Sequence, residues 1–262
     1  MNGLRDKTAI VTGAATLIGA DLVRAFAAAG TNVVMADINP ADGESVAAEI
    51  GERAVFQHTD VTDDASIDAC LKTATERFGG VDFLVNIAST YLDDGIATSR
   101  QDWLAALNVN LVGGAILIQK AAPLIAQRGG GAIVNYASIS AKRAQPGRLV
   151  YSSSKAAIMQ MTRSTALLLA PQNIRVNSVS PGWTWSNIIR DLSGGDRAKA
   201  DRIGGRFHLP GRIGDASEVA QAVLFLCSDA ASFINGEDIA VDGGYCAIGP
   251  EQTEDAVSKL AE

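Results

Sequence analysis

Short β-branched runs alternate with longer alanine-rich segments along most of this chain. The runs that predict strands are residues 8–12, 32–37, 54–58, 83–87, 132–136, 175–180 and 238–241. The segments that predict helices are residues 18–29, 41–50, 64–78, 100–127, 151–170 and 216–228. Apolar strands separated by helices form parallel sheets with both faces covered, and right-handed crossovers make such sheets doubly wound. The sequence therefore predicts an α/β fold with about seven parallel strands and helices on both faces.

One segment breaks this alternation. Residues 183–213 contain two glycine pairs, scattered charges and the apolar side chains of Trp183, Trp185, Ile188, Ile189 and Phe207. Long irregular segments in compact domains are often lids, although a plain surface loop is the alternative. We interpret residues 183–213 as a substrate lid within one domain that spans residues 1–262. From about residue 249 the chain is polar, and we expect a loosely attached tail there.

The charge balance is acidic, because 22 Lys and Arg stand against 29 Asp and Glu, for a net charge of −7. No basic run is present, so nucleic acid and anionic membranes are poor partners. The longest apolar stretch, residues 104–125, contains polar side chains and is typical of a buried helix rather than a membrane span. Neither a disulfide framework nor a metal site is suggested by the three distant cysteines, Cys70, Cys227 and Cys246. A cytoplasmic location fits this cysteine usage and the absence of a signal pattern.

A glycine-bearing turn, Thr12 to Gly19, follows the first predicted strand. A strand, such a turn and a helix make an anion site, because backbone N–H groups at the helix start point at phosphate oxygens. A tight structural turn is the alternative. The second strand ends at Asp37, 18 residues after Gly19, where a carboxylate can accept hydrogen bonds from an adenosine ribose or cap a helix. Asp60 ends the third strand, and its two interpretations are an adenine contact and a helix cap.

Tyr151 and Lys155 lie four residues apart, which on a helix puts both side chains on one face. An ammonium group favours the phenolate form of a nearby tyrosine, so the pair can act in general acid–base catalysis near neutral pH. Tyr and Lys at this spacing also occur by chance on solvated helices. The pair gains meaning from the other motifs of the chain.

Further motifs follow in a fixed order: Asn86 with Ala88, then Asn110, Ser138 placed 13 residues before Tyr151, Pro181 with Gly182, and the run Asp242, Gly243 and Gly244. Together with the turn and the Tyr151–Lys155 pair, they resemble the single-domain branch of the short-chain dehydrogenase/reductase family. The resemblance extends from residue 7 to about residue 245 and implies a Rossmann-type domain. Three positions depart from the family pattern: Leu17 replaces a glycine of the turn, and Ile87 and Ser89 replace an asparagine and a glycine. They bear on cofactor affinity more than on proton transfer.

The resemblance implies hydride transfer between an alcohol carbon and NAD. Tyr151 is then the acid/base, Lys155 lowers its pKa and binds the nicotinamide ribose, Ser138 binds the substrate oxygen, and Asn110 holds a water of a proton relay. The implied cofactor contacts are Gly13, Thr16, Ile18, Gly19, Asp37, Asp60, Val61, Asn86, Ala88, Tyr151, Lys155, Pro181, Gly182, Thr184 and Ser186. Substrate contacts are expected from Ser138, Ser140, Gln145, Tyr151 and Trp183.

The expected function is an NAD-dependent oxidoreductase that interconverts a secondary alcohol and a ketone. The pocket candidates favour an apolar cyclic or aromatic substrate and are Thr90, Tyr91, Ile139, Ser140, Gln145, Arg148, Trp183, Trp185 and His208. Arg143 and Arg148 are open candidates for binding an anionic substrate group or for simple solvation. The resemblance also implies a homotetramer, in which helices 100–127 and 151–170 pair across subunits. Two alternatives remain: a non-catalytic redox-sensing module that binds NAD, and a dehydratase or epimerase on the same scaffold.

Overall fold

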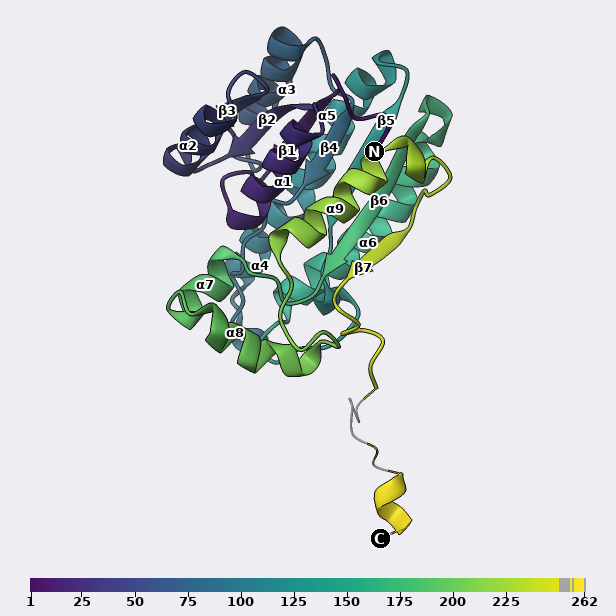
Figure 1. The fold of residues 1–262 in the computed structure, drawn as a ribbon. Helices are drawn as coiled ribbons and strands as arrows, with labels where there is room; N and C mark the ends of the chain where they lie inside the picture. The colour runs from purple at the N-terminus through teal and green to yellow at the C-terminus, as the bar shows by residue number, and fades with distance from the viewer. Residues whose placement is uncertain (250–254, 256, 262) are drawn as a thin grey trace.

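The computed structural model describes residues 1–249, 255 and 257–261. Within these residues, seven parallel strands form one sheet in the order β3-β2-β1-β4-β5-β6-β7 (Figure 1). The strands are β1 (Thr8–Thr12), β2 (Asn32–Asp37), β3 (Ala54–His58), β4 (Phe83–Asn86), β5 (Gly131–Tyr136), β6 (Ile174–Pro181) and β7 (Asp238–Val241). The predicted doubly wound α/β fold is confirmed. Because the strand order reverses between β1 and β4, ligands are expected beyond the carboxyl ends of these strands.

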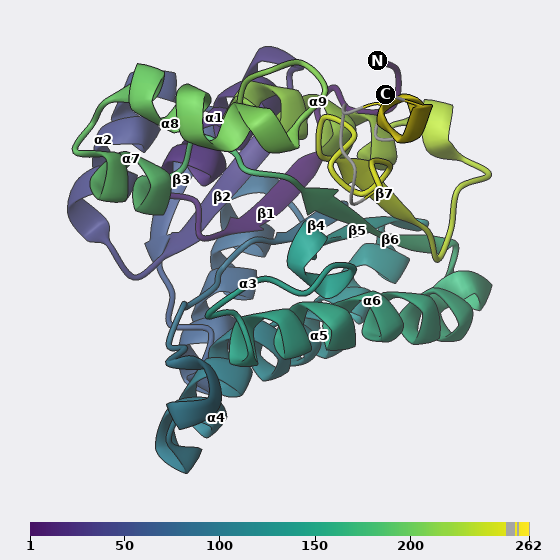
Figure 2. The same ribbon diagram turned by 90° about the horizontal axis from the view of Figure 1, so that it is seen from below.

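Helices cover both faces of the sheet, as Figure 2 shows. One face carries α1 (Leu17–Ala28), α2 (Pro40–Ile50) and α9 (Ala216–Cys227), and the other carries α3 (Asp64–Phe78), α5 (Gly114–Gln127) and α6 (Val150–Leu169). Side chains of a strand alternate between the faces. Val11 of β1 therefore joins the core under α1 and α9, whereas its neighbour Ile10 joins the core under α3 and α5. Short 3-10 turns occur at Gly95–Ala97, Ile139–Ala141, Ala170–Gln172, Gly205–Phe207, Asp229–Ala231 and Ser258–Ala261.

The segment predicted as one helix over residues 100–127 is divided into α4 (Arg100–Leu107), a π-helical turn (Asn108–Gly113) and α5. π-Turns inside helices are frequent at functional sites. Here the turn contains Asn110, whose buried side chain bonds the backbone of Thr90. By length and apolarity the whole segment would suffice to span a membrane. Its inward residues, including Leu117, Ala121 and Ile125, are buried in the core of the domain.

Residues 183–213 are more regular than the sequence predicts. They contain two short helices, α7 (Asn187–Ser193) and α8 (Arg197–Gly204), which form a lobe below the sheet in Figure 1. Each helix begins at a side-chain N-cap, which is Ser186 for α7 and Asp196 for α8. The glycine pair that suggested an irregular chain ends α7, where Gly194 adopts the left-handed conformation. The polar tail predicted from residue 249 lies largely outside the described residues.

Candidate active site

The turn between β1 and α1 has the backbone geometry of an anion site. Gly13 has a φ of +67°, and a Cβ at Gly19 would lie 2.2 Å from the Gly13 carbonyl oxygen, so both positions require glycine. Thr16 caps α1, because its Oγ1 accepts a hydrogen bond of 3.1 Å from Gly19 N and donates one of 2.8 Å to Gly13 O. Leu17, which replaces a family glycine, lines neither of the two cavities described below. Its backbone N–H instead donates to Asn187 Oδ1 of α7 at 2.8 Å.

A cavity of about 350 Å³ opens beside this turn. Asp37 lines it, and its carboxylate is held by hydrogen bonds of 2.9 Å from Ala15 N to Oδ2 and from Asn39 N to Oδ1. Asp60 lines the cavity and accepts hydrogen bonds from Thr62, which lower its pKa. It does not cap the next helix, because Asp63 is the residue that caps α3. Other predicted cofactor contacts on the wall are Gly13, Thr16, Ile18, Val61, Ala88 and Ser186.

A second cavity, of about 560 Å³, continues from the first and lies against the lobe of α7 and α8. Ile18, Ser89 and Ser186 line both cavities. The wall of the second cavity includes all five predicted substrate contacts, Ser138, Ser140, Gln145, Tyr151 and Trp183, and the predicted cofactor contacts Pro181, Gly182, Thr184 and Ser186. A paired cavity of this kind, with a glycine cradle at one end, fits a dinucleotide and a small substrate placed end to end.

Tyr151 lies in the first turn of α6, where Asp93 Oδ2 accepts a hydrogen bond of 2.8 Å from its backbone N–H. Its ring stacks on the ring of Tyr91, with centroids 4.7 Å apart and an interplanar angle of 18°. Burial raises the pKa of Tyr151 well above its usual value, and the neighbouring Tyr91 raises it further. A hydrogen bond with Ser138 and the charge of Arg148 act in the opposite direction. The phenol therefore depends on nearby donors and cations to give up its proton.

Lys155 is 2% exposed and lies under the Tyr151 ring, with Nζ 5.5 Å from the ring centroid. The ammonium group donates to Ser89 Oγ at 2.7 Å and to the Tyr136 carbonyl at 2.8 Å. Burial lowers the pKa of Lys155 to about 7. Ser89 departs from the family pattern at a position that we expect to affect cofactor affinity. In the structure its hydroxyl accepts a hydrogen bond from Lys155 and so also positions this lysine.

Asn110 is buried at the π-turn, and its side chain is held by three hydrogen bonds. Its Oδ1 accepts from Thr90 N at 2.7 Å, and its Nδ2 donates to Thr90 O at 3.0 Å and to Ser154 Oγ at 3.2 Å. A cavity of about 10 Å³ adjoins it, lined also by Lys155 and Asn86, which is about the space that one water requires. Asn86 Oδ1 is buried without a protein partner, so this cavity suits a polar occupant.

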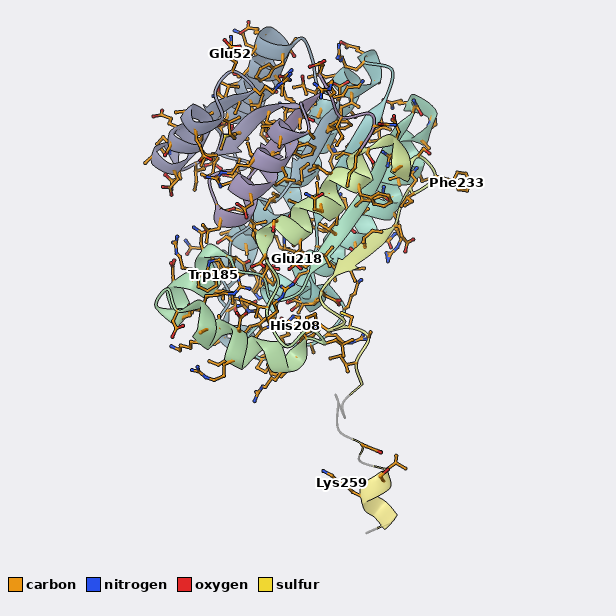
Figure 3. All side chains as sticks on the ribbon, in the orientation of Figure 1. Glu52, Trp185, His208, Glu218, Phe233 and Lys259 are labelled. Carbon is orange, nitrogen blue, oxygen red and sulfur yellow. The ribbon has the colours of Figure 1, made fainter. Side chains whose placement is uncertain are left out.

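Three residues predicted at the pocket have structural contacts instead, and one of them, Thr90, bonds the Asn110 side chain through its backbone. His208 accepts a hydrogen bond of 3.1 Å from Trp183 N through Nε2 and contacts the Gly204 carbonyl through Nδ1 at 2.9 Å. Trp185 carries the Arg197 guanidinium over its ring at 5.6 Å. Figure 3 labels His208 and Trp185 in the lobe below the sheet. None of the three lines the substrate cavity, whereas lobe residues that the sequence did not single out, among them Leu192, Lys199 and Ile203, do.

We expect Lys155 to make the stability of the cofactor-free protein rise with pH. Its pKa is about 7 in the folded chain against 10.5 in the unfolded chain, so the unfolded state binds one more proton between these values. The free energy of unfolding should therefore increase by about 2 kcal/mol from pH ~7 to pH ~9. Urea unfolding of the wild type and of Lys155→Met measures this increment, which the variant should lack. Equal pH slopes in the two proteins would contradict it.

Comparisons with known proteins agree with this geometry. The family model described as Enoyl-(Acyl carrier protein) reductase matches residues 13–246. Cis-4-hydroxycyclohexanecarboxylate dehydrogenase of Sinomonas cyclohexanicum is 36% identical over 253 residues, which cover 93% of this chain and 98% of the relative. D-threitol dehydrogenase of Mycolicibacterium smegmatis is 35% identical over 246 residues, which cover 92% of this chain and 94% of the relative.

A solved structure is similar over the same range. The 3-ketoacyl-(acyl-carrier-protein) reductase from Brucella melitensis complexed with NADH superposes with a TM-score of 0.85 and 30% identity, covering 93% of this chain and all of that chain. The family model and the relatives thus extend over nearly the whole sequence. On this ground, the chain belongs to the short-chain dehydrogenase/reductase family of oxidoreductases.

Proposed function

We propose that this protein is an NAD-dependent oxidoreductase that interconverts a secondary alcohol and a ketone, with a cyclic or aromatic substrate and with Tyr151 as acid/base. One observation carries the proposal: Tyr151, Ser138 and Lys155 share the wall of the cavity of about 560 Å³ that continues into the glycine-turn cavity. The apolar side chains Trp183, Phe207 and Ile203 on that wall suit a ring. A relative whose name gives a hydroxycyclohexane acid as substrate supports the same class.

The nicotinamide of NAD supplies the hydride acceptor or donor when bound. The chain supplies proton transfer and orientation. In oxidation Tyr151 takes the proton of the substrate hydroxyl, and in reduction it returns one to the carbonyl oxygen. Ser138 donates to the same oxygen and stabilises the negative charge that develops on it. Lys155 favours the phenolate by its charge, and Ser89 and the Tyr136 carbonyl hold it in place.

The remaining roles follow from position. Gly13, Thr16, Ile18 and Gly19 hold the pyrophosphate at the turn, and Asp37 accepts hydrogen bonds from the adenosine ribose. Asn110 and the small cavity beside it connect Lys155 to a water of the proton relay. Residues 183–213 act as the lid that excludes water from the substrate. The enzyme is cytoplasmic, and its partners are small molecules and copies of itself, with neither nucleic acid nor membrane among them.

A panel of cyclic, aromatic and aliphatic secondary alcohols and ketones, followed by NADH absorbance, tests the proposal. A cyclic or aromatic alcohol should yield one NADH per molecule oxidised. NAD binding without turnover of any alcohol would instead favour the redox-sensing module. Product formation without net consumption of free NAD would favour a dehydratase or epimerase.

We expect a homotetramer in solution. Several large apolar side chains are exposed on the described surface, with Leu167 and Leu168 of α6 at 78% and 70% and Leu104 of α4 at 63%. Phe233, which Figure 3 shows at the edge of the molecule, is fully exposed. Apolar patches of this kind mark subunit contacts. Light scattering at micromolar concentration should give four chain masses, and Leu168→Glu should lower that mass. A monomeric wild type would overturn the expectation.

A further inference from the structure

We propose that the substrate carries a carboxylate, which is bound by the two open cations that line the substrate cavity, Arg148 before α6 and Lys199 on α8. The inference deepens the proposed function, because it names the chemical class of substrate for the same site. It rests on the charges that line the cavity, on the open donors of two cations and on the apolar side chains of the same wall.

The lining of the substrate cavity has the opposite charge to the protein as a whole. The chain carries 29 acidic against 22 basic residues, yet none of the described residues that line the cavity is acidic, while Arg148, Lys155 and Lys199 are basic. A concave site with low-dielectric walls and charges of one sign attracts ligands of the opposite sign. Because the lining has basic but no acidic side chains, this cavity is suited to an anionic ligand.

The guanidinium of Arg148 packs with its flat face against two tyrosine rings, which leaves the N–H donors at its edge open. Its guanidinium carbon lies 5.3 Å from the ring centroid of Tyr91 and 5.7 Å from that of Tyr151. Within the described residues this guanidinium forms no ion pair or hydrogen bond, so its planar set of N–H donors is available to a ligand. Such a fork matches the two oxygens of a carboxylate. Arg143, the other arginine candidate, is exposed and donates to the Cys246 carbonyl at 2.7 Å instead.

Lys199 supplies the second cation from the lobe. It lies on α8, is half-buried and lines the cavity, and its ammonium group has no acidic partner among the described residues. Other lysines of comparable burial are paired, as Lys120 is with Asp68 at 2.6 Å. Because Arg148 comes from the segment before α6 and Lys199 from the lobe, the cavity has a cation on each of two separate elements.

Apolar side chains on the same cavity wall indicate the rest of the substrate. Ile188, Ile189 and Phe207 line the cavity from the lobe, so an uncharged ring is favoured there. The predicted substrate is therefore a cyclic secondary alcohol, or its ketone, that also carries a carboxylate. Lys155 is not part of this anion site, since Ser89 and the Tyr136 carbonyl engage it.

The test compares matched substrates, 4-hydroxycyclohexanecarboxylate and its uncharged carboxamide, with saturating NAD. The wild type should prefer the acid by about 10-fold or more in kcat/KM. In Arg148→Gln and in Lys199→Met this ratio should fall toward one. Any effect of Arg148 on Tyr151 acts on both substrates and cancels in the ratio. Arg143→Gln, which changes an arginine outside the cavity, is the matched control and should keep the wild-type ratio.

A binding measurement keeps the inference separate from turnover. Cyclohexanecarboxylate has no hydroxyl, so calorimetry reports its affinity even in an inactive protein; the wild type should bind it more tightly than cyclohexanecarboxamide, and Arg148→Gln should not. Carboxylate binding that depends on Arg148, without oxidation of any alcohol, would overturn the proposed function and leave the anion site standing. Equal affinity for acid and amide, or a preference unchanged in both variants, would overturn the anion site. If Arg148→Gln fails to fold, Lys199→Met decides.

Discussion

Tyr151→Phe should abolish turnover while leaving NAD binding nearly intact. In the proposed mechanism the phenol exchanges a proton with the substrate oxygen, and general acid–base contributions amount to about 10²–10⁴-fold in rate. The ring itself is kept in Phe, so its stacking on Tyr91 and its contact with the Lys155 ammonium persist. Steady-state kinetics with the best alcohol of the panel measures kcat, and fluorescence titration measures NAD affinity.

Ser138→Ala serves as the matched comparison for this variant. In the proposed mechanism Ser138 donates a hydrogen bond to the same oxygen but transfers no proton, so its loss should lower kcat less than the loss of the phenol. A Tyr151→Phe protein that retains more than roughly a tenth of the wild-type kcat would remove Tyr151 from the acid/base role. A parallel loss of NAD affinity would indicate that the substitution disturbs the cofactor cavity.

The environment of Tyr151 disfavours the phenolate form, so a nearby cation would help the phenol to lose its proton. Burial and the neighbouring Tyr91 both raise the pKa of the phenol, and Ser138 and Arg148 lower it. Lys155 Nζ lies 5.5 Å from the ring centroid, and burial lowers the pKa of this lysine to about 7. Charges near a buried group interact more strongly than they would in water. Proton transfer at this position is therefore sensitive to a change at any of these groups.

The alternation of strands and helices was sufficient to predict the fold, because continuous apolar strands must be covered on both faces. The four-residue spacing of Tyr151 and Lys155 also predicted their proximity, since α6 begins at Val150 and carries both in its first turns. The position of Asp37 was predictable for a similar reason. The strand that ends at Asp37 runs parallel to β1, so its carboxyl end must lie beside the glycine turn that follows β1. Local pattern and topology together determine these positions.

Other features depend on contacts between distant segments, which no local pattern records. The π-turn at Asn110 accompanies hydrogen bonds to Thr90 and Ser154, so periodicity alone predicted one continuous helix over residues 100–127. Arg143 and Arg148 were equivalent in the sequence, and only the fold directs one to a backbone carbonyl and the other to the cavity. Ser89 was recognisable as a departure from the family pattern, but its bond to Lys155 requires the packing of α6 on the sheet.

A strong preference for NAD over NADP is expected, and Asp37 should determine it. Its carboxylate is 8% exposed and is fixed at the end of β2 by hydrogen bonds from Ala15 N and Asn39 N. With NAD it can accept hydrogen bonds from the ribose hydroxyls, whereas the 2′-phosphate of NADP would meet it as a like charge. The lost hydrogen bonds add to that repulsion. Discrimination on the order of 10²-fold in kcat/KM corresponds to about 3 kcal/mol.

None of the described residues that line the cavity around Asp37 is a Lys or Arg that could bind the 2′-phosphate of NADP. Substitutions that supply such a cation should therefore change the cofactor preference. Residues 14–18 contain no Lys or Arg, while Ile38 is 65% exposed beside the cavity and leaves room for a longer side chain. Asp37→Ala combined with Ile38→Arg should shift the preference toward NADP, because it removes the repulsion and adds a guanidinium that binds phosphate. Ile38→Arg alone is the control and should change the ratio less. Equal kcat/KM for the two cofactors in the unmodified enzyme would show that Asp37 serves only to hold the turn.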